Sequence, residues 1–137
     1  MTIYEHILQW ANDKNLRFQQ SEQDIVFFSN GQLGDWISRV RAIEEDGMIF
    51  VLSAYPFYVD PEDREAAALA LCEINCTLKT GTFYLDPEDG QINFRLGQFL
   101  WPTNDEETAQ RVDYLIMLAM GAMDAYYQTM LDIADEE

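Results

Sequence analysis

The stretch WISRVRAIEEDGMIFVLSAY, residues 36–55, decides the fold that we expect. Its first part alternates like a half-buried strand, and one face of that strand would carry Trp36, Ser38, Val40 and Ala42. Glu44–Gly47 then predicts a hairpin turn, with the glycine where a positive φ is needed. Met48–Tyr55 is apolar on both faces and ends at Pro56. Such a strand lies in the centre of a sheet, or a second subunit covers one of its faces.

The sequence on either side predicts three helices and three further strands. Thr2 and Glu5 match a capping box for a first helix ending near Asn15, and Asp60-Pro61 begins a second helix that ends before Gly81. Thr103 or Asn104 caps a last helix, which we expect to run from about Asp105 to about Ala134. The other expected strands are Ile25–Phe28, Thr82–Asp86 and Gln91–Phe99. The order α-β-β-β-α-β-β-α predicts one α+β domain over residues 1–137, with a five-stranded, mainly antiparallel sheet and three helices.

The charge of the chain narrows the classes of partner. Its 137 residues include 25 acids and 8 bases, which gives a net charge of −17. This field repels nucleic acids and anionic membrane surfaces, so we expect neither as a partner, although Arg39 and Arg41 beside Trp36 are the best candidates for a nucleic-acid site. It attracts basic or amphipathic protein segments, although the same acids also serve solubility. No apolar run is long enough to span a membrane, and we expect a cytoplasmic protein.

No pattern of catalytic or ligand-binding residues stands out. The only histidine, His6, lies on the flank of the first helix, far from any nucleophile that the sequence singles out. Cys72 and Cys76 lie four residues apart on one helix and are expected to be small buried residues rather than metal ligands. We therefore predict no catalytic residue, no metal site and no cofactor. A small enzyme or ligand-binding protein that uses a carboxylate pair in a pocket stays open as the alternative.

Excess apolar surface is expected on the last helix and on the central strand. Four of the six methionines belong to this helix, and only Gly121 interrupts the apolar run from Tyr114 to Met123. A helix that is apolar all round must be covered all round, which predicts a homodimer or a partner protein. The expected interface residues are Met117, Met120, Met123, Tyr126, Tyr127, Val51 and Tyr55. We accordingly predict a non-enzymatic module, chaperone-like or a regulatory adaptor, that binds a segment of a partner protein.

The segment from Asn75 to Arg95 resembles the YbjN-like family, in which an Asn follows a helix and precedes a pattern of Gly, aromatic, Asp, Gly, aliphatic and Phe-Arg. The family is similar in fold to the type III secretion chaperones, which are small acidic homodimers that hold an extended segment of a partner. The resemblance implies a chaperone-like or regulatory role. In the matched segment, Gly81 and Gly90 are expected at turns and Phe83 and Phe94 in the core. Asn75 would cap a carbonyl near the helix end, and Arg95 would pair with an acid across the hairpin.

Overall fold

The central hairpin forms where the alternating sequence predicts it. The computed structural model describes residues 1–100 and 104–135. Strands β3 (Asp35–Ile43) and β4 (Met48–Tyr58) pair antiparallel, and Gly47 in the turn between them has a φ of 63°. As expected, alternate residues of β3 are buried, from Trp36 to Ala42. Since β4 has β3 on one side and β6 on the other, it occupies the centre of the sheet.

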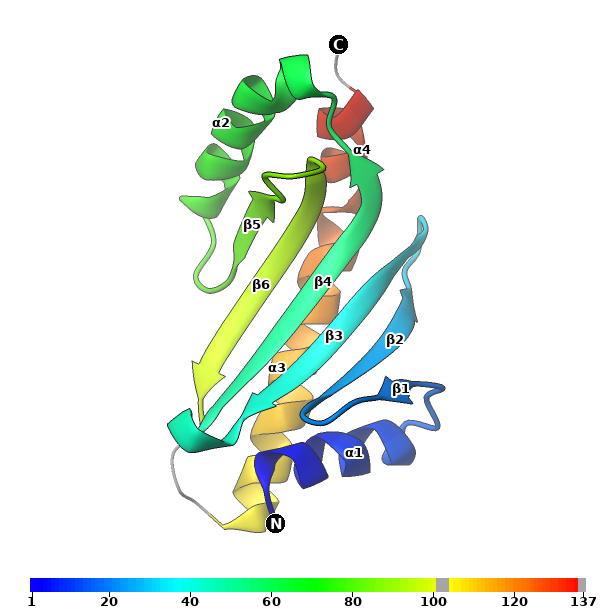
Figure 1. Ribbon diagram of the computed structural model, residues 1–137, viewed down its shortest axis with the longest axis vertical. Helices are drawn as coiled ribbons and strands as arrows, with labels where there is room; N and C mark the ends of the chain where they lie inside the picture. The colour runs from blue at the N-terminus through cyan, green and yellow to red at the C-terminus, as the bar shows by residue number, and fades with distance from the viewer. Residues whose placement is uncertain (101–103, 136–137) are drawn as a thin grey trace.

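Among the described residues, six antiparallel strands form one sheet in the order β1-β2-β3-β4-β6-β5, and four α-helices accompany it (Figure 1). The remaining strands are β1 (Gln19–Gln20), β2 (Asp24–Asn30), β5 (Thr82–Leu85) and β6 (Gln91–Phe99). The helices are α1 (Ile3–Asp13), α2 (Arg64–Asn75), α3 (Asp105–Ala125) and α4 (Tyr127–Asp135). Short 3-10 turns at Glu44–Asp46 and Pro61–Asp63 complete the elements.

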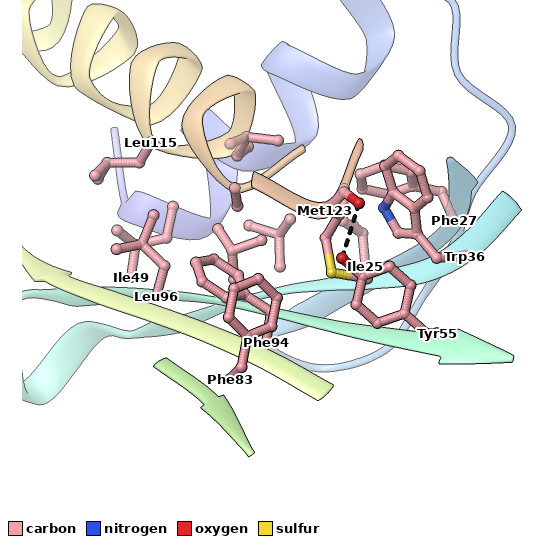
Figure 2. Close-up of a cluster of buried hydrophobic side chains, with 14 of the residues drawn as sticks. Ile25, Phe27, Trp36, Ile49, Tyr55, Phe83, Phe94, Leu96, Leu115 and Met123 are labelled. Carbon is pink, nitrogen blue, oxygen red and sulfur yellow. Dashed lines mark hydrogen bonds between the residues drawn. The ribbon is translucent and has the colours of Figure 1, made fainter. Parts of the chain in front are cut away.

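The core lies between one face of the sheet and the helices α1, α3 and α4. In Figure 1, α3 runs behind the strands, and α2 lies beside β5 at the edge of the sheet. Side chains of the central strands meet those of α3 in this layer, among them Ile49, Phe94 and Met123 (Figure 2). The hydroxyl group of Tyr55 donates a hydrogen bond of 2.8 Å to the carbonyl oxygen of Met123, which joins β4 to the end of α3. Burial raises the pKa of the Tyr55 hydroxyl, and the nearby Tyr127 and Asp124 raise it further.

The α+β class and the starts of the first and last helices are confirmed. Thr2 and Glu5 form the predicted capping box, and the side chain of Asn104 accepts a hydrogen bond from the backbone N–H of Glu107. The alternative cap, Thr103, lies outside the described residues. At the second predicted start, Asp60 makes no side-chain capping hydrogen bond, and the 3-10 turn Pro61–Asp63 leads into α2 at Arg64. Within the described part of the chain, no helix is both long and apolar enough to cross a bilayer.

Four details of the prediction are wrong. The predicted sheet lacks β1, which has only two residues and no apolar pattern. The long last helix breaks at Tyr126, so that α4 turns Tyr127 toward the rings of Trp36 and Tyr55. Pro56 does not end β4, because it lies at a bulge where the ladder with β6 is interrupted and no N–H is needed. Cys72 and Cys76 are exposed free thiols rather than buried residues.

Candidate protein-binding surface

Within residues 1–100 and 104–135, no helix packs on one of the two faces of the sheet. Strand residues alternate between the core and this other face, which Figure 1 presents to the viewer. We call it the open face. It is formed by Val26, Phe28, Ile37, Arg39, Arg41, Phe50, Leu52, Ala54, Tyr84, Asn93 and Arg95. Phe28 is 73% exposed and Ile37 43% exposed, so large apolar side chains meet solvent side by side on neighbouring strands. Contiguous exposed apolar surface of this kind is typical of interaction sites.

The open face is hollowed on both sides of its centre. A hollow of about 690 Å³ lies over β4, β6 and β5, between Phe50 and Tyr84, with Gly97 and Arg95 in its lining. A second hollow, of about 380 Å³, lies between β1 and β3, with Phe28, Ile37 and Arg17 in its lining. The open face therefore has two shallow pockets that can accept apolar side chains, and each pocket has an arginine in its lining.

Asp24 and Arg39 form an ion pair at the β2 side of the open face. The Nη1 of Arg39 donates to Oδ2 of Asp24 at 2.8 Å, and the hydroxyl of Ser21 donates to the same carboxylate. Burial by itself would raise the pKa of Asp24. The hydrogen bonds from Ser21 and Arg39 and the charges of Arg39 and Arg41 outweigh that effect and hold the pKa below its ordinary value of 3.8.

We expect Asp24→Asn to lower the free energy of unfolding by about 1–2 kcal/mol at pH 7, because Arg39, half exposed to solvent, loses its charged partner. A depressed pKa stabilises the folded state above the pKa of the unfolded state, and this contribution is lost as the pH falls through the folded value. The difference between the two proteins should therefore shrink below about pH 4. Urea unfolding at pH 7 and pH 3 measures it, with the exposed Glu22→Gln as control. A difference that stays constant with pH would contradict the assigned ion pair.

The seven residues predicted for the interface divide into two groups. Val51, Tyr55, Met123 and Tyr127 are at most 7% exposed in the chain by itself. For these four the prediction of a surface role is wrong, because β4 faces α3 and α4 and the chain covers its own apolar residues. Met120 and Tyr126 are half-buried. Met117 is 48% exposed on the outer face of α3, one turn from Tyr114, which is 66% exposed.

The candidate nucleic-acid residues are separated by the sheet. Arg39 and Arg41 lie on the open face, whereas Trp36 points into the core and is 3% exposed. The aromatic neighbours of the arginines are instead Phe28 and Phe50. The odd-numbered positions from 37 to 43 are Ile, Arg, Arg and Ile, so the period of two had already placed both arginines on the strand face opposite Trp36. On β3 this outward face has two arginines and one acid, Asp35, which is unusual in a chain of charge −17.

The acidic residues beside α1 serve helix packing. His6 is buried and forms a 3.0 Å hydrogen bond with Oδ1 of Asp105, which lowers the pKa of that carboxyl group. The indole N–H of Trp10 donates to Asp113 at 2.9 Å, and Lys14 forms an ion pair with the same carboxylate. These contacts join α1 to α3 and give the carboxylates protein partners. Among the described residues, one group of acids could hold a cation, at Asp60, Glu62 and Asp63 on the surface before α2.

Residues 4–132 match the YbjN family, which is described as "Putative bacterial sensory transduction regulator". The chain belongs to the YbjN family. This confirms the resemblance drawn from the segment between Asn75 and Arg95. The family description is that of a regulator rather than of an enzyme. No curated protein matches the chain significantly.

A solved structure of a YbjN protein has the same fold. Its title is "Crystal structure of YbjN, a putative transcription regulator from E. coli". The two chains are 15% identical and align with a TM-score of 0.64 over 93% of this chain and 92% of the other. The six-stranded antiparallel sheet with four helices is thus a YbjN-like fold.

Proposed function

We propose that this YbjN-family chain is a non-enzymatic regulator that acts by binding a segment of another protein across its open face. The observation that carries the proposal is the asymmetry of the sheet. One face is packed by α1, α3 and α4, whereas the other exposes Phe28 and Ile37 and is covered by no helix of the described part of the chain. A monomeric protein rarely leaves such a surface without a use.

We further propose that two copies pair through the outer face of α3. Tyr114, Met117 and Gly121 lie along this face, and a side chain at Gly121 would meet nothing within 4 Å. An antiparallel pairing centred near Met117 would set each Tyr114 ring against the glycine of the other copy. This pairing would bury Met117, the exposed one of the three methionines of α3, and would leave the open face free for a partner. A homodimer that holds a segment of another protein is also how the type III secretion chaperones work, and the chaperone-like part of the proposal rests on that resemblance.

Site-specific photo-crosslinking in the cells that express the protein tests both parts. A benzophenone amino acid would replace Phe28 on the open face, Met117 on α3, or Leu69, which is 63% exposed on α2 and serves as the matched apolar control. We expect position 28 to crosslink to a different protein, position 117 to a second copy, and position 69 to neither.

Each position has its own contradicting result. Equal crosslinking from positions 28 and 69 would remove the open face as a specific binding surface. A monomer in light scattering, with no crosslinked dimer from position 117, would remove the pairing through α3 and leave the open face untouched.

A further inference from the structure

The open face differs in charge from the rest of the molecule. Three of the eight basic residues of the chain, Arg39, Arg41 and Arg95, lie on its strands, and a fourth, Arg17, lines its second hollow. Its acids are Asp24, which Arg39 neutralises, and Asp35 at the end of β3. Among the described residues, neither Arg41 nor Arg95 forms an ion pair with a carboxylate. In a chain of net charge −17, the open face therefore carries unpaired positive charge.

The arginines alternate with apolar side chains across the strands. Arg39, Leu52 and Arg95 are direct neighbours in one row of the ladder, and Arg41 pairs with Phe50 in the next. The guanidinium group of Arg95 lies 4.6 Å from the centre of the Phe50 ring. That ring in turn lies across Gly97, where a Cβ would come within 2.4 Å of it. Arg95 is thus held in place by a cation–π contact, while its outer edge stays available for hydrogen bonds.

We propose that the segment bound by the open face is an acidic amphipathic helix, an inference that rests on the proposed function. Its apolar side chains would lie over Phe28, Ile37 and Leu52, and its Asp and Glu side chains would pair with Arg41 and Arg95. The net charge of the chain by itself favours a basic partner. The charge of the open face is of the opposite sign, and it favours an acidic segment at this surface. The face is a better site than the edges of the sheet, because the edge strands β1 and β5 have only two and four residues.

Charge also disfavours two other occupants. A second copy packed face to face would bring the arginines of both copies together, against a face whose acids are only Asp35 and Asp24, which is already paired with Arg39. A nucleic acid would meet a narrow basic strip surrounded by a strongly acidic molecule, and its phosphates would be repelled beyond that strip. A helix of roughly 20 residues, about 30 Å long, has room to place apolar and acidic side chains on this one surface.

The test is an unbiased selection from a displayed library of random peptides of roughly 20 residues, using the whole chain as bait. We expect the enriched peptides to carry large apolar residues at helical spacing with Asp and Glu beside them. Arg41→Glu combined with Arg95→Glu should weaken the best peptide at least about tenfold. The control pair, Lys79→Glu with Arg111→Glu, makes the same change in net charge at exposed positions outside the open face and should change the affinity less than about twofold.

Arg95→Lys guards against a folding artefact, because it keeps the charge over Phe50 and should retain most of the affinity. Enrichment of basic or uncharged peptides would overturn the inference, and so would equal weakening by the two pairs of variants. Tighter binding of a single-stranded DNA oligomer than of any peptide, lost in the Arg41→Glu and Arg95→Glu protein, would assign the face to nucleic acid instead. If no peptide is enriched while position 28 still crosslinks to a protein, the acidic helix is wrong and the proposed function stands; if both fail, both are wrong.

Discussion

Met123→Asp is expected to unfold the protein. The Met123 side chain is fully buried between α3 and the sheet, and the carbonyl group of the same residue accepts the hydrogen bond from Tyr55 (Figure 2). The substitution removes a packed side chain and buries a carboxylate without a partner, at a total cost of at least about 5 kcal/mol. Domains of this size are stable by only about 5–15 kcal/mol, so little or no folded protein should remain.

Met117→Asp is the matched control on the same helix. Met117 is 48% exposed, and an aspartate there should cost less than about 1 kcal/mol. Near-UV circular dichroism and urea unfolding separate the two outcomes. If Met123→Asp retained a native near-UV spectrum, the packing of α3 on the sheet would be contradicted. Loss of a dimer in the Met123 variant would report unfolding, so only the Met117 variant can test an interface.

Met117 and Met123 show which features of the helix can be predicted from the sequence and which cannot. Periodicity predicts that both belong to one apolar helix, and that helix forms. It does not predict which side of the helix the sheet covers, because residues 114–123 are apolar almost all round. Tertiary packing decides that Met123 is core and Met117 is surface. The same ambiguity led to the wrong prediction that Val51 and Tyr55 are interface residues.

Strand β3 behaves differently, because its alternating sequence leaves only two choices for the buried face. The alternation from Trp36 to Ile43 correctly separates a buried face from an exposed one. The sequence also contains the arginines of the open face. The contacts that each arginine makes, however, depend on which residues lie beside it on the neighbouring strands. Arg95 was expected to pair with an acid across the hairpin, and instead it stacks on Phe50, which is 45 residues away in the chain.

Asn75 illustrates a motif residue whose role is visible only in three dimensions. It was expected to cap a carbonyl group at the end of its helix. Instead, its amide group makes two hydrogen bonds to the backbone of Phe83, donating to the carbonyl at 2.9 Å and accepting from the N–H at 2.8 Å. The Asn75 side chain thus makes the two hydrogen bonds that a neighbouring strand would otherwise make to Phe83 at the outer edge of β5.

We expect Asn75→Ala to lower the free energy of unfolding by about 2–4 kcal/mol. Phe83 is 1% exposed, so its backbone N–H and carbonyl would both be left without a partner in a buried position. Asn75→Asp keeps an acceptor for the N–H but places a charged oxygen against the carbonyl, and it should cost a similar amount. Urea unfolding measures the loss, and hydrogen exchange of the Phe83 amide reports the contact itself.

Asn93→Ala is the matched control, because its amide makes one hydrogen bond, 2.9 Å to the carbonyl of Gln91, at a partly exposed position. Its cost should be about 0.5–1 kcal/mol, with the protection of the Phe83 amide unchanged. If the Phe83 amide stayed protected in Asn75→Ala, another part of the protein would have to cover this edge of β5, and the role assigned to Asn75 would be contradicted.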